Sequence, residues 1–91
     1  MALAVLFTPK QMTTEKYDEV IKRLEAAGAG APAGRLYHAC YGASGDLRVF
    51  DVWESQETFD RFGQTLMPIL QQVGVDPGQP EIIEAHNVVA G

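Results

Sequence analysis

The chain has 91 residues, with 12 acidic and 7 basic side chains and a formal net charge of −5. This length suits one small domain over 1–91 whose core alone would be marginal, so burial against a second copy is expected. The acidic balance and the scattered Lys and Arg argue against nucleic acid and against an anionic membrane surface as partners. No run of about 18 apolar residues occurs, so no membrane span is expected. The single cysteine, Cys40, excludes an internal disulfide and the usual zinc clusters, and it agrees with a reducing, cytoplasmic location.

The first third of the chain predicts a strand, a helix and a linker. Residues 2–8, ALAVLFT, form a short apolar run typical of a central strand. The segment MTTEKYDEVIKRLEAAG follows and predicts a helix that Thr13 or Thr14 caps and that Gly28 stops. Residues 28–34, GAGAPAG, are too rich in Gly, Ala and Pro to be anything but a linker.

The remainder predicts a hairpin, a second helix and a last strand. Residues 35–42 and 47–54 alternate as strands do, and the turn ASGD between them makes a β-hairpin. Ser55 is a good N-cap for the next helix, and Pro68 inside the apolar stripe of that helix predicts a kink or a division into two. Residues 81–89, EIIEAHNVV, form the last strand.

This βαββαβ order predicts an α+β domain with the ferredoxin-like fold. Right-handed crossovers place the first and third strands in the middle of a four-stranded antiparallel sheet, with two helices on one face. The opposite face is bare and too apolar to remain in contact with water. Two copies are therefore expected to pack these faces together as a homodimeric α/β barrel, with a ligand cavity between the two sheets.

A turn of even length in the hairpin fixes which side chains share a face. It pairs Cys40 with Val49, His38 with Asp51, and Leu36 with Trp53 on one face. The other face then carries a more uniformly apolar set, which is better suited to packing against helices: Tyr37, Ala39, Tyr41, Phe50 and Val52. The first face, which mixes apolar walls with an imidazole, a carboxylate and an indole, is therefore assigned to the bare side and its cavity.

The last strand adds two candidates to this cavity. Glu84 and His86 share one face of it with Ile82 and Val88, although the sequence does not settle which face that is. A metal site built from Glu84, His86, His38 and Asp51 would draw on three strands without a dense local motif, so no metal is expected.

His38 and Asp51 are the candidate catalytic pair. A carboxylate can hold an imidazole in one tautomer and raise its basicity, which makes a general base for an acidic C–H or a phenol. The alternative is a hydrogen-bonded pair that only satisfies two polar groups beneath an interface. Trp53 is expected to be a cavity wall, Cys40 a small buried hydrophobe, and Tyr17 a member of the apolar stripe of the first helix.

The segment VFDVWESQETFDRF, residues 49–62, joins an apolar strand to Trp-Glu-Ser and a helix with an aromatic residue four positions after the Ser. With the βαββαβ order over the whole chain, it resembles the dimeric α/β-barrel superfamily, especially its antibiotic-biosynthesis-monooxygenase-like members. That group includes cofactor-independent quinone-forming monooxygenases, haem-degrading enzymes, lactone isomerases and polyketide cyclases. The resemblance implies a homodimer that needs no cofactor, binds a small apolar or aromatic molecule, and has Trp53 in its cavity.

The haem-degrading branch matches this chain poorly. That branch uses a His on the second helix about ten residues after the Trp, where this chain has Phe62, Gly63 and Gln64. It also has an Asn on the first strand, which is missing here. The leading interpretation is a cofactor-independent monooxygenase acting on an aromatic or polyketide-like substrate. The alternatives are a polyketide cyclase or lactone isomerase, a non-catalytic ligand-binding or stress-response protein, and a barrel filled by its own side chains.

Overall fold

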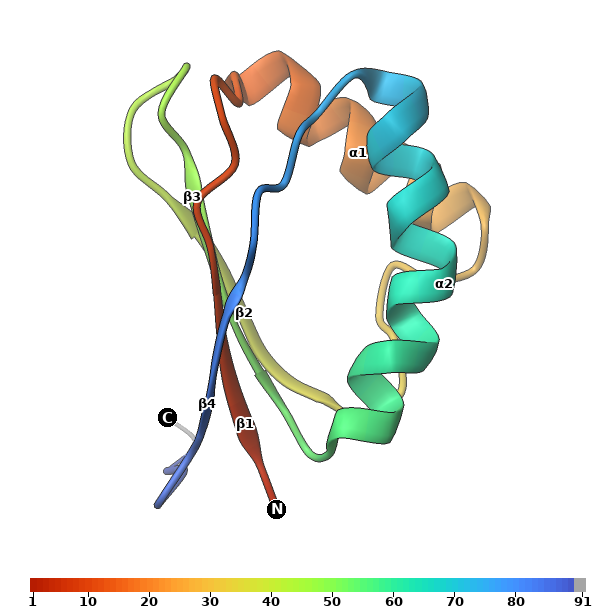
Figure 1. Ribbon diagram of the computed structural model, residues 1–91. Helices are drawn as coiled ribbons and strands as arrows, with labels where there is room; N and C mark the ends of the chain where they lie inside the picture. The colour runs from red at the N-terminus through yellow and green to blue at the C-terminus, as the bar shows by residue number, and fades with distance from the viewer. Residues whose placement is uncertain (90–91) are drawn as a thin grey trace.

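The computed structural model describes residues 1–89 and has the expected βαββαβ order. Helices α1 and α2 lie together over one face of the sheet and leave the other face uncovered (Figure 1). The elements in chain order are β1 (Leu3–Phe7), α1 (Thr14–Ala26), β2 (Arg35–Tyr41), β3 (Arg48–Trp53), α2 (Gln56–Val73) and β4 (Glu81–Glu84). The ferredoxin-like α+β fold predicted from the sequence is confirmed.

The sheet has the order β2-β3-β1-β4, and all of its neighbouring strands are antiparallel. The first and third strands therefore occupy the middle, as the handedness of the two crossovers requires. Strand β4 is shorter than the predicted 81–89, and residues 85–89 lie outside it. His86 is thus not a strand residue, and its side chain is exposed.

Side chains cap both helices in the way the sequence indicates. The Thr13 hydroxyl accepts a hydrogen bond from the Lys16 amide at 3.2 Å, and the Ser55 hydroxyl accepts one from the Thr58 amide at 3.2 Å. Helix α2 ends at Gly74, whose φ of 84° is the left-handed C-cap conformation. Pro68 does not divide this helix, because the position is exposed and solvent can satisfy the carbonyl that the ring leaves free.

The hairpin register is confirmed, with one correction. His38 lies opposite Asp51, and Cys40 lies opposite Val49. An irregularity between Arg35 and Tyr37 shifts the start of β2, so Arg35 and not Leu36 lies opposite Trp53. The extra residue of the bulge, Leu36, is left 52% exposed and does not join the predicted face.

The predicted assignment of the two sheet faces is wrong. The face with His38, Asp51 and Trp53 packs beneath the helices, and Trp53 is completely buried. The centroid of its indole lies 5.8 Å from the centroid of the Phe59 ring and 5.1 Å from that of the Phe62 ring, both on α2. Burying the largest side chain of the sheet against two phenylalanines outweighs the cost of burying one carboxylate, which is already hydrogen-bonded.

The uncovered face carries the set that the sequence assigns to the helices. Tyr37 is 54% exposed and Ile83 is 57% exposed, and Tyr37 contacts Phe50 edge to face at 6.2 Å between ring centroids. The helix-free side of the sheet is therefore an aromatic and aliphatic surface without the polar pair.

Candidate functional site

A cavity of about 60 Å³ lies between the helix-covered face of the sheet and the two helices. Aliphatic, aromatic and proline side chains form most of its wall. Four polar side chains also line it: Tyr17, Arg35, His38 and Asp51. The sequence predicted a cavity between the sheets of two copies, whereas this one is formed by a single chain.

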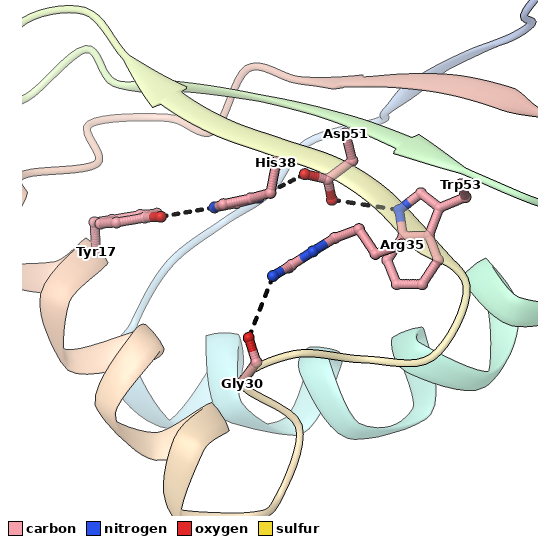
Figure 2. Close-up of polar contacts among 6 residues, drawn as sticks. All are labelled: Tyr17, Gly30, Arg35, His38, Asp51 and Trp53. Carbon is pink, nitrogen blue, oxygen red and sulfur yellow. Dashed lines mark hydrogen bonds and ion pairs between the residues drawn. The ribbon is translucent and has the colours of Figure 1, made fainter. Parts of the chain in front are cut away.

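Three of these polar groups form a chain of short hydrogen bonds from helix to sheet (Figure 2). The Tyr17 hydroxyl on α1 is 2.7 Å from Nε2 of His38 on β2. Nδ1 of the same ring is 2.6 Å from Oδ1 of Asp51 on β3. The Tyr17 and His38 rings are nearly parallel, at 7°, so the phenol meets the imidazole edge to edge.

The chemistry of these groups fixes the direction of each hydrogen bond. A carboxylate can only accept, so Nδ1 of His38 carries the proton that it donates to Asp51. When the imidazole is neutral, this is the Nδ1–H tautomer, so Nε2 is an acceptor and the Tyr17 hydroxyl donates to it. The outward lone pair of the candidate base is therefore occupied by a phenol.

Trp53 provides the last hydrogen bond in this series, at Asp51. Its indole N–H donates to Oδ2 of Asp51 at 3.4 Å, which is longer than the usual hydrogen bond and so holds the carboxylate more weakly than His38 does. With 2% exposure, Asp51 depends on these two donors to replace water. The indole backs the carboxylate and is not part of the cavity wall.

Burial raises the pKa of two side chains near the cavity, Tyr17 and Cys40. Desolvation raises the pKa of Tyr17 above its ordinary value of 10.0, Cys40 adds to this increase, and the Arg35 charge opposes it. The phenol is therefore a proton donor at neutral pH and not a phenolate base. Desolvation also raises the pKa of the Cys40 thiol, with a smaller contribution from Asp18, so that side chain is an unreactive thiol.

Arg35 is the cation of the cavity. Its Nη2 donates to the carbonyl of Gly30 at 3.3 Å, and its guanidinium carbon lies 5.9 Å from the centroid of the Phe62 ring. Figure 2 shows its side chain on the helix side of the sheet, next to the chain of hydrogen bonds. None of the ion pairs within residues 1–89 involves it.

The structure brings only part of the predicted site together. His38, Asp51 and Val49 line the cavity, while Cys40 packs on the core beside it. Three predicted cavity residues lie elsewhere and are exposed: Leu36, Glu84 and His86. Glu84 on β4 pairs with Leu3 on β1, and Leu3 pairs in turn with Trp53 on β3. Two strands, β1 and β3, therefore lie between Glu84 and His38 on β2.

Sequence reasoning missed Tyr17 and Arg35. By its spacing Tyr17 is one more apolar position of its helix, yet it is the only member of that stripe with a hydroxyl to donate. By its position Arg35 is an ordinary strand end, and the bulge that turns it inward has no clear signature in the sequence. The sequence could have indicated Tyr17 only through His38, because a buried histidine needs a polar partner on the element that packs over it.

Two features that residues 1–89 lack bear on the kind of site this is. No group of three or more His, Cys, Asp or Glu side chains in this range is arranged to hold a metal ion. None of the helices in the same range combines the length and the apolar character that crossing a bilayer demands.

Comparison with known proteins places the fold but not a family. No family model matches the chain, and no curated protein matches it. Among solved structures, a candidate antibiotic biosynthesis monooxygenase from Chloroflexus aurantiacus is similar, with a TM-score of 0.69 and 12% identity over 99% of this chain and 98% of that one. SnoaB, a cofactor-independent oxygenase from Streptomyces nogalater, has a TM-score of 0.63 and 14% identity over 99% and 96%. A further candidate antibiotic biosynthesis monooxygenase, from Caulobacter crescentus, has a TM-score of 0.66 and 18% identity over 97% and 91%.

Proposed function

We propose that this protein binds a small aromatic or polyketide-like molecule in the cavity beneath its helices and oxidises it with O₂ without a cofactor. The observation that carries the proposal is the hydrogen-bonded series from Tyr17 through His38 to Asp51, which lines a mainly apolar cavity. Such a chain can accept a proton from an acidic C–H or phenol and hold the charge that results.

The proton moves through the tyrosine. The substrate proton passes to the Tyr17 oxygen while the Tyr17 proton passes to Nε2 of His38, and the electron pair of the broken bond stays on the substrate. Asp51 then stabilises the imidazolium through the 2.6 Å contact at Nδ1. His38 is the base of this mechanism, and Tyr17 transmits its action to the substrate.

Dioxygen is the co-reactant for the substrate anion. In a substrate of the anthrone type, the CH₂ carbon gains one oxygen atom and becomes a carbonyl. The other oxygen leaves as water with the two hydrogens of the CH₂ group, one of which returns through His38. The balanced reaction needs O₂ and the substrate as its only reactants.

The size of the cavity limits what can bind without movement. About 60 Å³ holds a few water molecules, whereas benzene occupies an apolar cavity of about 150 Å³. A shallow groove of about 450 Å³ shares three lining residues with the cavity: Leu70, Val75 and Pro77. An aromatic substrate therefore requires these side chains to move so that the two spaces join, and the joined space would then be of ordinary ligand size.

The solved structures with this fold support the reaction class. One of them is a cofactor-independent oxygenase, and two are candidate antibiotic biosynthesis monooxygenases. At 12–18% identity these likenesses extend to the fold, so the reaction rests on the residues of this cavity.

Oxygen uptake with a hydroxyanthrone as the probe tests the proposal. We expect quinone formation at the expense of O₂ by the unaltered protein. The variant H38A should lose about 100-fold or more in kcat, because it lacks the base, and D51N should lose at least about tenfold. H86A is the matched control, since His86 is exposed and away from the cavity, and it should keep full activity.

Each other outcome points to a different function. Conversion of a substrate without O₂ uptake would indicate a cyclase or an isomerase, and binding without conversion would indicate a ligand-binding protein. An oxidation that survives unchanged in both H38A and D51N would exclude His38 as the base and the proton transfer through Tyr17 with it.

A further inference from the structure

Arg35 places a positive charge on the wall of a mainly apolar cavity, and most of its donors meet no acceptor in residues 1–89. Five N–H groups are available on a guanidinium, and in residues 1–89 only Nη2 meets a protein acceptor, the Gly30 carbonyl at 3.3 Å. Arg35 takes part in none of the ion pairs of residues 1–89, and the carboxylate on the same cavity wall, Asp51, is hydrogen-bonded to His38 and Trp53 instead. A half-buried arginine in this state is arranged to receive an anion from outside the chain.

The field of Arg35 reaches the reacting end of the hydrogen-bond chain. The pKa of Tyr17 is raised chiefly by burial, and Arg35 is the charge that opposes this rise. A group that favours negative charge on the Tyr17 oxygen will favour it on a substrate oxygen beside it as well. The low-dielectric wall of the cavity strengthens this effect relative to water.

The charges of the cavity and of the whole chain favour a substrate that arrives neutral and is deprotonated in the cavity. Arg35 and Asp51 cancel in the resting cavity, with a neutral imidazole between Asp51 and Tyr17. Transfer of one proton to His38 creates one imidazolium and one substrate anion, so the sum is unchanged. The chain as a whole has a formal net charge of −5, which repels ligands that are already anionic.

We propose that Arg35 forms an oxyanion subsite that selects substrates with an acidic phenol or enol hydroxyl and binds them as the deprotonated form. The proposal rests on the function above, in which His38 takes the proton. It adds the substrate class, because an ether, a hydrocarbon or a neutral ketone without an enol form offers no oxygen anion to Arg35. Arg35 touches the substrate oxygen, whereas Asp51 acts only through His38.

Binding of 4-nitrophenol tests the subsite without any turnover or O₂. Its phenolate form has a visible absorption band, so a pH titration of the bound probe reports its pKa directly. We expect the pKa of the bound probe to fall below that in water. We also expect the unaltered protein to bind the phenolate at least about tenfold more tightly than the neutral isostere 4-nitroanisole.

Three variants locate the effect. R35M should lose the tenfold preference and the fall in pKa, whereas R35K should keep part of both because it keeps the charge. R61M is the matched control, because it removes the same charge from an exposed residue that pairs with Glu57 on α2. The burial of Trp53 makes its fluorescence a check that each variant is folded.

Several results would overturn the subsite. They are equal probe pKa values in the unaltered protein and R35M, 4-nitroanisole binding as tightly as the phenolate, or no binding of the probe by the unaltered protein. Tighter binding of 4-nitrobenzoate than of the phenolate would show a carboxylate site instead. A positive result with no oxidation of any hydroxyanthrone would leave the subsite standing and refute the oxygenase, so the two failures are distinguishable.

Discussion

At the scale of single residues, Tyr17 changes what the His38–Asp51 pair can do. Without it, Nε2 of His38 would face the cavity as an open base. With the hydroxyl at 2.7 Å, the imidazole is held at both nitrogens, by a carboxylate on one side and by a phenol on the other. The pair is therefore well satisfied as a structural unit, and in the proposed mechanism the Tyr17 proton couples it to the cavity.

The raised pKa of Tyr17 has a consequence for stability. The folded chain keeps the phenolic proton to a higher pH than the unfolded chain, in which the pKa is near 10.0. This contribution is complete below pH 10 and is lost as the pH rises through the folded value, so stability should fall in that alkaline range. The variant Y17F should show a smaller fall, because it has no proton to lose.

Urea denaturation followed by Trp53 fluorescence between pH 8 and about pH 11 checks this expectation. Y37F is the matched control, since Tyr37 is on the uncovered face, and it should retain the decline of the unaltered protein. Identical alkaline profiles for Y17F and the unaltered protein would contradict the argument.

At the scale of elements, the linker between α1 and β2 sets the position of Arg35. Gly34 has φ of +87°, and a Cβ there would lie 2.5 Å from the Thr58 side chain at the start of α2. The Gly34 carbonyl accepts a hydrogen bond from the Glu54 amide at 2.8 Å. This close approach ties the start of β2 to the β3–α2 junction, immediately before the bulge that turns Arg35 inward.

The variant G34A should therefore be destabilised by about 2 kcal/mol or more, from the positive φ and from the clash with Thr58. G45A separates the two causes, because Gly45 has φ of +93° but open space around its missing Cβ. We expect a loss of about 1 kcal/mol there, and a gain of about 0.5–1 kcal/mol for G63A inside α2. Denaturation midpoints measure all three, and a G34A midpoint equal to that of G45A would remove the clash from the explanation.

At the scale of the whole molecule, the uncovered face of the sheet is the surface that most needs a partner. Tyr37, Tyr41 and Ile83 are each about half exposed on it, and a chain of 91 residues has little core to spare. We therefore expect two copies to pack these faces together, which is the predicted homodimer with a different set of residues at its centre.

Sedimentation at micromolar concentration should give twice the 9.9 kDa of one chain. Y37E and I83E place a charge in the interface and should shift the protein toward the monomer. M67E is the control, since Met67 is 50% exposed on α2, away from this face. A stable monomer of the unaltered protein would refute the dimer.

The sequence predicted the elements and the pairing of His38 with Asp51 because both follow from local rules, namely periodicity, capping and the parity of a turn. It did not predict the correct face, because β1 is apolar on both sides and both faces of the hairpin carry aromatic residues. The choice depended on how well Trp53 fits between Phe59 and Phe62, which is a tertiary property. Arg35 was missed for a similar reason, since a bulge of one residue changes which side chains point inward.

Because His38 and Asp51 face the helices and not the uncovered side of the sheet, two kinds of evolutionary change are separated. The residues of the proposed ligand site lie beneath the helices of one chain, and those that would join two chains lie on the opposite surface. Adjacent positions along one strand, such as Tyr37 and His38, therefore belong to different roles. Ligand preference and quaternary structure can then diverge independently among descendants of such a chain, without either constraining the other.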